Sequence, residues 1–350
     1  MWASLAVTAI KLVVVAGGML TVVPVMVWVE RRGAAFIQDR LGPNRVGPFG
    51  LLQPVLDAVK LIFKEDLTPA GVNRALFLAA PMISMFVALL TFIVIPFGAG
   101  KDITVFGTPL DGLSVAPQLG VGVLFLLAVG SLGVYGIVLA GWSSNNKYSL
   151  LGGLRSSAQL ISYELSMTLA VLGVLLATGS LRLDDVVARQ AAHVWLGFIP
   201  QWNVVPQFLG FVVFTTAAFA ETNRLPFDLA EAETELVAGY HVEYSSMKFA
   251  AFFMSEYVNM ATASALVVTL FLGGWTFPGM QHFSGWPLLI LSVAAFAAKV
   301  AFFLGLFVWV RWSLPRFRYD QLMRLGWKGL LPLAAVNMLW VGTAIAMRWI

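Results

Sequence analysis

Apolar and polar residues alternate along this chain in long blocks. Eight apolar runs are each close to the ~20 residues that a helix needs to cross about 30 Å of hydrocarbon. The fifth run is the weakest, because Asn203 and Pro206 shorten it. The pattern predicts an all-α polytopic membrane protein, a single membrane domain over 1–350 with eight transmembrane helices. The predicted spans are Leu5–Val29, Ala75–Phe97, Gly120–Gly141, Ala158–Ala177, Val204–Ala220, Phe249–Gly274, Trp286–Trp312 and Leu330–Trp349.

A shorter amphipathic pattern lies in the first polar loop, over 30–74. After turn residues at 42–48, apolar positions recur at three- and four-residue spacing, with Gln53, Asp57 and Lys60 on the opposite face. The spacing predicts an interfacial helix. Such a helix either lies flat on the membrane or roofs a cavity that opens to the lipid. Its apolar positions are Leu51, Leu52, Val55, Leu56, Val59, Ile62 and Phe63.

Lys and Arg residues are distributed unequally between the loops of the two membrane sides. If eight spans alternate, the loops of one side hold sixteen Lys and Arg residues and those of the other side hold four. Cytoplasmic loops are enriched in Lys and Arg, so we expect a multi-pass protein of a bacterial inner membrane with both termini periplasmic. The cytoplasmic side then carries loop 30–74, an acidic loop at 221–248 and a basic loop at 311–328. The four basic residues of the other side are Lys101, Arg182, Arg189 and Arg348.

Negative charge is concentrated between the fifth and sixth runs. Residues 219–257 contain seven of the chain's 18 acidic residues. Close carboxylates raise one another's pKa and can share protons, as a proton relay requires. A short helix is expected at Leu229–Val237, with Glu231 and Glu235 on one face. The alternative interpretation is a solvated acidic loop. Interleaved aromatic residues and the position of Glu256 inside a span speak against it. The seven are Glu221, Asp228, Glu231, Glu233, Glu235, Glu243 and Glu256.

Three further charges fall inside predicted spans, where ionisable residues are expensive. Glu164 is therefore expected to be functional or paired. Lys11 can extend to the periplasmic surface, and Lys299 is expected to form a structural salt bridge or to serve transport. Outside the spans, Asp184, Asp185 and Arg189 are expected to form a solvated face with no assigned function.

Composition narrows the chemistry. The chain is 59% hydrophobic and 11% charged, against about 25% charged in soluble domains. It has no cysteine, which excludes disulfides and cysteine-ligated iron–sulfur clusters. The histidines His193, His241 and His282 are far apart and form no metal-ligand pattern. The net charge of +4 gives no reason to expect nucleic acid as a partner, since the basic residues flank apolar runs.

Four motifs resemble the H-subunit family of bacterial respiratory complex I, the NADH:quinone oxidoreductase, whose mitochondrial counterpart is NADH dehydrogenase subunit one. The family has eight transmembrane helices, in agreement with the predicted count. The motifs are ERRGAAFIQDRLGPNRVGPFGLLQPVLDAVKLIFKED, SAQLISYE, AETNRLPFDLAEAETELVAGYHVEYSSMKFAAFFMSEY and LPRFRYDQLMRLGWK.

The resemblance implies a subunit that forms part of the quinone cavity, where the membrane arm meets the hydrophilic arm, and that couples quinone reduction to proton translocation. The implied partners are the other membrane-arm subunits, the hydrophilic-arm subunits, quinone and membrane lipid. Quinone is a substrate; FMN and the iron–sulfur clusters are expected on partner subunits, so this chain alone should hold no catalytic redox centre. The implied quinone-cavity residues are Arg31, Asp57, Arg224, Phe227, Asp228, Glu231 and Arg318. The implied proton-path residues are Glu164, Glu221, Glu233, Glu235, Glu243 and Glu256.

Two other functions remain open at this point. Buried Glu and Lys residues suit a secondary ion transporter, although such proteins are built from inverted repeats and no repeat is found. The homologous subunit of a membrane-bound hydrogenase would use no quinone. The intact motif from Leu41 to Asp66 favours the quinone enzyme.

Overall fold

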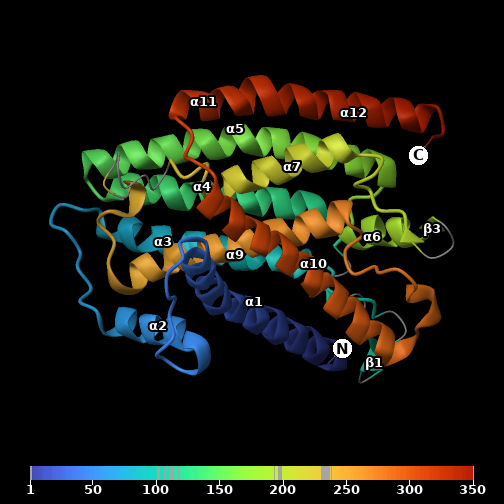
Figure 1. Cartoon of the computed structure of the whole chain (residues 1–350), viewed down its shortest axis with the longest axis horizontal. Helices are drawn as coiled ribbons and strands as arrows, with labels where there is room; N and C mark the ends of the chain where they lie inside the picture. The colour runs from blue at the N-terminus through green and yellow to red at the C-terminus, as the bar shows by residue number, and fades with distance from the viewer. Residues whose placement is uncertain are drawn as a thin grey trace.

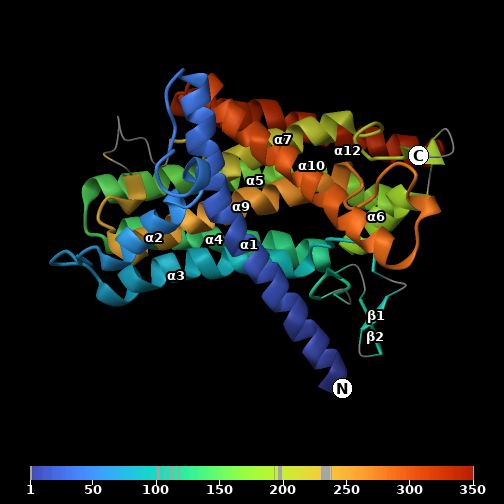
Figure 2. The same cartoon turned by 60° about the horizontal axis from the view of Figure 1, so that its bottom comes forward.

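The fold is a bundle of helices, seen in a computed structural model of the chain. The structure describes residues 2–100, 103–105, 107–110, 113–116, 119–192, 194–195, 199–229, 237 and 239–349. Most helices run along the long axis of the molecule, whereas α1 and α10 cross the others obliquely (Figures 1 and 2). The described α-helices are α1 (Trp2–Ile37), α2 (Gln53–Phe63), α3 (Arg74–Leu90), α4 (Gly122–Ser143), α5 (Lys147–Thr178), α6 (Leu183–Ala192), α7 (Phe208–Glu221), α9 (Ser246–Phe271), α10 (Gly285–Ser313), α11 (Tyr319–Arg324) and α12 (Leu331–Ala346).

Short elements complete the described chain. The 3₁₀ helices are η1 (Pro48–Gly50), η2 (Thr91–Val94), η4 (Gly239–His241) and η5 (Met280–His282), and η6 (Leu325–Leu330) is a π-helix that joins α11 to α12. Two antiparallel hairpins pair β1 (Thr104–Val105) with β2 (Thr108–Pro109) and β3 (Val194–Trp195) with β4 (Ile199–Pro200).

Seven described helices are long and apolar enough to cross a membrane, which confirms the predicted membrane class. The fifth predicted span differs: α7 has 14 residues, about 21 Å of helix. Its predicted beginning is instead a turn tied to the end of α9. There the Val204 N–H donates to the Phe271 carbonyl at 2.9 Å, and the Asn203 side chain donates to the Leu270 carbonyl at 2.8 Å. These bonds hold the segment around Pro206 outside the helix.

Two helix boundaries also differ from the sequence prediction. Helix α5 begins at Lys147, well before Ala158, because the Asn146 side chain caps it by accepting from the Tyr148 N–H at 2.9 Å. The last span begins at Tyr319, because η6 links α11 to α12 without a break.

The helix predicted in loop 30–74 is confirmed as α2, which packs against α1 and α9. All seven of its predicted apolar positions are exposed on the chain. An exposed apolar face suits either contact with lipid or the roof of a cavity.

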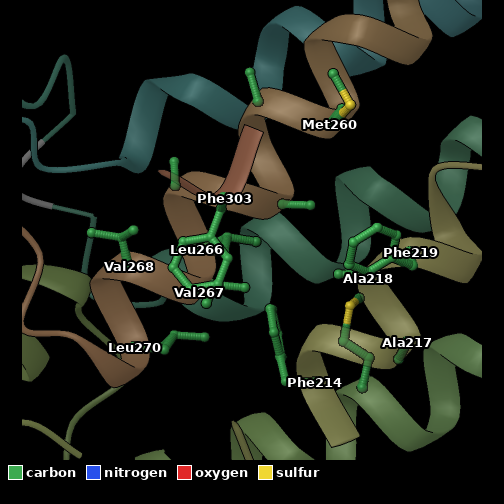
Figure 3. Close-up of a cluster of buried hydrophobic side chains, with 14 of the residues drawn as sticks. Phe214, Ala217, Ala218, Phe219, Met260, Leu266, Val267, Val268, Leu270 and Phe303 are labelled. Atoms are coloured by element: carbon green, nitrogen blue, oxygen red, sulfur yellow. The ribbon is translucent and has the colours of Figure 1, made fainter. Parts of the chain in front are cut away.

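The core lies where α7, α9 and α10 meet. Figure 3 shows Phe214 and Phe219 of α7 facing Leu266 of α9 and Phe303 of α10. Small residues let other helices approach closely, as is usual in membranes. At Gly136 of α4, an added Cβ would overlap the Ser84 hydroxyl of α3.

The loops separate into two ends of the bundle. One, which we call the loop end, carries α2 and α11; the other, the terminal end, carries α6, both hairpins and the two chain ends (Figure 1). Lys11 was expected to extend to the surface, but its side chain does not reach solvent. It is 8% exposed and donates to the Ser114 carbonyl at 3.3 Å.

Lys299 departs from the expected structural salt bridge, and its role in transport stays a prediction. Its ammonium group donates to the carbonyls of Leu272, Gly274 and Thr276 at 2.7, 3.0 and 2.6 Å, just beyond α9, and lies 4.6 Å from the Trp202 ring. No carboxylate among the described residues forms a salt bridge with it. Cations stabilise the carbonyl end of a helix, so this contact joins α9 to α10.

Candidate functional site

Three glutamates from three helices share one buried space. Glu164 of α5, Glu221 at the end of α7 and Glu256 of α9 line a cavity of about 50 Å³. A second cavity of the same size adjoins it at Glu164 and Glu221, and extends along α9 past Asn259 to Thr262. A cavity of this size has room for water, which needs about 10–15 Å³ and polar partners. The arrangement can pass protons between carboxylates through water.

Hydroxyl groups hold two of these carboxylates in place. The Ser131 hydroxyl of α4 donates to Glu164, and the Tyr240 hydroxyl of η4 donates to Glu256 at 3.1 Å. The segment containing Tyr240 packs directly on α5, where an added Cβ at Gly152 would lie 2.7 Å from the Gly239 Cα. The described part of the acidic loop is therefore folded against the bundle, and the interpretation of this part as a solvated loop is wrong.

An ionic chain continues from this cavity toward α1. The Arg224 guanidinium lies 3.9 Å from Glu256 and 3.7 Å from Glu30, the residue before Arg31 in α1. The Tyr257 hydroxyl donates to Glu30 at 2.6 Å, and Arg311 of α10 forms an ion pair with the same carboxylate. The side chains of Arg224 and Glu30 are only 7% and 10% exposed. In this low-dielectric setting, a change of charge on one member acts strongly on the next.

The turn after α7 positions Arg224, and a buried amide holds the turn. Gln159 of α5 donates to the Ala220 carbonyl at 2.7 Å and to the Phe227 carbonyl at 2.9 Å. Asn223 adopts φ of 50°, in the left-handed region, which reverses the chain direction. Irregular backbone at this depth is tolerated because protein surrounds it and satisfies its carbonyls.

Glu243 lies apart from the shared cavity, in the connection between η4 and α9. Its carboxylate accepts from the Asn146 amide at 2.6 Å, next to the start of α5. Its neighbour Tyr244 donates to the Phe77 carbonyl at 3.1 Å and stacks on the Phe77 ring at 4.0 Å. Burial raises the pKa of Tyr244 to about 12, so this hydroxyl stays protonated near neutral pH and acts as an anchor.

Sequence comparisons now bear on this geometry. A family model described as NADH dehydrogenase matches residues 10–342. The chain belongs to the NADH dehydrogenase family. Its relatives include two NADH-quinone oxidoreductase H subunits. That of Koribacter versatilis is 49% identical with 98% of each chain covered, and that of Geobacter metallireducens is 50% identical with 94% of this chain and 93% of the relative covered. The NADH-quinone oxidoreductase subunit 8 of Rhodothermus marinus is 48% identical, with 97% of each chain covered.

As a member of the NADH dehydrogenase family, the chain is a membrane subunit of an NADH-quinone oxidoreductase. Its described residues contain no group of three acidic or histidine side chains that could hold a metal ion. The chemistry that this chain itself contributes is that of carboxylates, arginines and tyrosines.

Two candidate quinone residues, Phe227 and Asp228, lie directly after the turn of Arg224. Phe227 is buried, with its ring 5.4 Å from that of Tyr163, and Asp228 pairs with Arg316 at 2.9 Å. These contacts bring the segment that connects α10 to α11 beside the turn.

The other candidates are more dispersed. Arg31 and Asp57 form an ion pair that joins α1 to α2. Arg318 is 78% exposed and pairs with Asp320 at 3.2 Å, without reaching the ionic chain. Glu231, Glu233 and Glu235 lie outside the described residues, as does most of the helix expected at Leu229–Val237.

Sequence reasoning missed four members of the site. The sequence places Glu30 only at the start of loop 30–74 and Arg311 only in the basic loop 311–328, whose charge suggests contact with the acidic loop or a partner. A carboxylate that closes an apolar run beside two arginines is a usable signal for Glu30. Ser131 and Tyr257 gave no such signal, because hydroxyl residues are frequent in membrane helices. Their roles depend on which helices meet in space.

Proposed function

We propose that this subunit forms part of the quinone-binding cavity, where the membrane arm meets the hydrophilic arm, and couples quinone reduction to proton translocation through buried carboxylates. One observation carries the proposal: charged groups continue from Arg311 and Glu30 through Arg224 and Glu256 into the cavity of Glu221 and Glu164. Such a line leads from the loop end into the interior of the bundle.

An apolar hollow supports the quinone side of the proposal. A cavity of about 490 Å³ opens beside the end of α1, lined by Trp28, Val29 and Phe36 together with Arg32 and Arg40. Helix α2, whose predicted apolar positions are exposed, packs against the same helix α1 (Figure 2). Hydrocarbon walls suit an isoprenoid tail, and the arginines suit the polar headgroup.

Electrons must come from partner subunits in this proposal. Reduction of a quinone to a quinol takes two electrons and two protons. FMN and the iron–sulfur clusters are expected on the hydrophilic-arm subunits, and the remaining membrane-arm subunits continue the proton path. This chain supplies the cavity and the groups that respond to charge.

Arg224 connects the two processes. Two unit charges about 4 Å apart interact by about 4 kcal/mol at an effective dielectric constant of about 20. Negative charge that forms on a quinone near Asp228 draws a proton toward the neighbouring carboxylates. Protonation of Glu256 removes one of the two attractions on Arg224 and favours its contact with Glu30. Protonation near the quinone thereby changes the charge balance of the inner cavity.

The orientation in the membrane is inferred from the distribution of Lys and Arg between the loops. We propose that the loop end faces the cytoplasm of a bacterial cell and that both termini are periplasmic. Location reporters fused near Asn44, Asn146 and Tyr319 should give cytoplasmic signals. A periplasmic signal at Asn146 would reverse the orientation and move the quinone site to the wrong side.

The coupling proposal is tested on the assembled enzyme. Glu256→Gln and Glu164→Gln remove a titratable carboxyl while keeping its shape. Both variants should assemble and should lose NADH:quinone activity and proton pumping about a hundredfold or more, in line with the usual contribution of a positioned acid or base. Asp185→Asn, at the terminal end, is the matched control and should be nearly silent. Wild-type rates and pumping in both Gln variants would remove the proton path from this cavity.

A further inference from the structure

Helix α2 has little packing of its own to hold it in place. Pro54 is the only buried one of its 11 residues, and its apolar face is exposed. A helix of this length is marginally stable by itself. On the side of α1 it is held by the ion pair of Arg31 and Asp57, whose side chains are 46% and 27% exposed. Exposed ion pairs contribute little, so the position of α2 depends on its other contacts.

The first turn of α9 supplies those contacts. Ser245, Ser246 and Lys248 all bind the end of α2 or the segment that follows it, and we call these three residues the α9 clamp. The Ser246 hydroxyl donates to the Leu61 carbonyl at 2.9 Å, which satisfies a carbonyl in the last turn of α2. The Ser245 hydroxyl accepts from the Leu67 N–H at 3.0 Å. The end of α2 is therefore attached to α9 through hydrogen bonds.

Lys248 makes the largest number of contacts in the clamp. Its ammonium group lies 2.9 Å from the Asp66 carboxylate, and donates to the Thr68 hydroxyl at 2.9 Å and to the Leu67 carbonyl at 3.2 Å. An ammonium group has three donors, and here each has an oxygen. Lys248 is 9% exposed and its ammonium lies 5.0 Å from the Phe77 ring. Water and salt screen such a contact less than they screen the pair of Arg31 and Asp57.

The backbone of the clamp is also unusual. Ser246 adopts φ of 53°, in the left-handed region that residues other than glycine rarely occupy. Such a conformation persists only where the surrounding contacts hold it, and the bond to Leu61 is one of these contacts. The chain thus accepts an unfavourable conformation at the point where α9 meets α2.

The beginning of α2 adjoins the apolar hollow beside α1. Trp28, which lines this hollow, donates its indole N–H to the carbonyl of Phe49 at 3.1 Å, shortly before α2 begins. The Arg32 guanidinium, in the same lining, lies 5.8 Å from the Phe49 ring. A displacement of α2 would therefore disturb the hollow.

We propose that Lys248 is a positioning residue for quinone. By fixing the end of α2 to α9, it holds the exposed apolar face of α2 as a wall for the isoprenoid tail. This inference rests on the proposed quinone-binding function. Lys248 acts outside the carboxylate cavity, because its partners Asp66 to Thr68 do not line that cavity. A longer tail contacts more of the wall, so the effect of loosening α2 grows with the number of isoprene units.

The test uses the assembled enzyme and two quinones that differ only in tail length. Lys248→Met removes the ammonium group and keeps an apolar side chain. The KM for the long-tailed quinone should rise about tenfold, which corresponds to about 1.4 kcal/mol, while kcat and the KM for the short-tailed quinone stay at wild-type values. Hydrogen exchange of the α2 amides, followed by mass spectrometry, should become faster. Lys248→Arg should restore both properties. Lys64→Met, which removes an exposed charge near Asp66, is the matched control and should change neither.

A second variant keeps the test decisive if Lys248→Met does not assemble. Asp66→Asn changes a side chain that is 57% exposed, and should raise the same KM to a smaller extent. The double variant should be no worse than Lys248→Met alone, because both substitutions remove one contact.

Two results would overturn the inference. One is an equal change in KM for both quinones, which a merely structural role would give. The other is faster exchange of α2 with an unchanged KM for the long-tailed quinone. In either case the proposed proton path would still be judged separately, by the activity and pumping of Glu256→Gln and Glu164→Gln.

Discussion

Arg224 is a buried cation of this bundle and Lys299 a partly buried one, and their partners differ in kind. Arg224 lies between two carboxylates, Glu30 and Glu256, at distances close to 4 Å. Lys299 lies among three main-chain carbonyls, each within about 3 Å. Carboxylates gain and lose protons, whereas carbonyls do not. The partners of Arg224 can therefore change their charge, whereas the partners of Lys299 stay neutral.

The largest expected effect comes from removing the shared cation. Arg224→Ala leaves Glu30 and Glu256 without their common partner, and breaking a buried ion pair costs about 3–5 kcal/mol. We expect little or no assembled enzyme, measured by native gel electrophoresis of membranes. Arg224→Lys keeps the charge and should assemble with reduced activity. The exposed Arg324 provides the control, and Arg324→Ala should assemble normally.

Neutralising both carboxylates should rescue assembly but not function. The triple variant Glu30→Gln, Arg224→Gln, Glu256→Gln removes all three buried charges, and only the partly exposed Arg311 loses its carboxylate partner. Uncharged replacements of buried ion pairs are often tolerated. The complex should form again while proton pumping stays low. Restored pumping would mean that the ionic chain is structural. Arg224 and Lys299 would then both serve only to hold helices together.

A smaller effect is expected at the terminal end. Lys299→Met removes the donor to three carbonyls, and each unsatisfied buried group costs about 1–3 kcal/mol. The thermal midpoint of the purified enzyme should fall. Turnover and the number of protons pumped per quinone should remain at wild-type values per assembled complex. A specific loss of pumping would show that Lys299 belongs to a proton path and would break the comparison.

The smallest effect concerns Tyr244, the anchor beside Glu243. Its pKa is raised to about 12 by burial, above the ordinary value of about 10. The unfolded chain therefore loses this proton first, and the stabilisation by Tyr244 is present below about pH 10 and declines as the pH rises toward 12. Tyr244→Phe should lower stability by about 1 kcal/mol at neutral pH. Its thermal midpoint should also fall less steeply than that of the wild type from about pH 9 to about pH 11.

Hydrophobic pattern alone predicted most of the architecture, because a membrane requires long apolar helices with internal hydrogen bonds. It failed where side chains compete locally. Asn146 starts α5 early through a cap, and Asn203 and its neighbours bind the end of α9 and shorten α7. Both effects depend on individual polar contacts that a hydropathy average does not register.

The candidate site was predictable to a different extent. The concentration of acids and the resemblance pointed to Glu164, Glu221 and Glu256, which line a shared cavity. The pairing of Glu30 with Arg224 joins residues almost 200 positions apart in sequence. For Lys299 the sequence prediction failed. A lone cation in a span suggested a carboxylate partner, but the partners are neutral main-chain carbonyls just beyond α9.

The shortness of α7 has an electrical consequence. The helix starts at the terminal end and is about 21 Å long, less than the ~30 Å of hydrocarbon. If the first residue of α7 lies at the membrane surface, its last residue, Glu221, lies inside the insulating layer. A proton that reaches Glu221 from either face has crossed part of the membrane voltage, which is worth about 2.3 kcal/mol per charge for each 100 mV across the full thickness. On this placement we expect protonation of Glu221 to depend on the membrane potential as well as on pH, so that a larger potential opposes proton transfer to Glu221 from one face and favours it from the other.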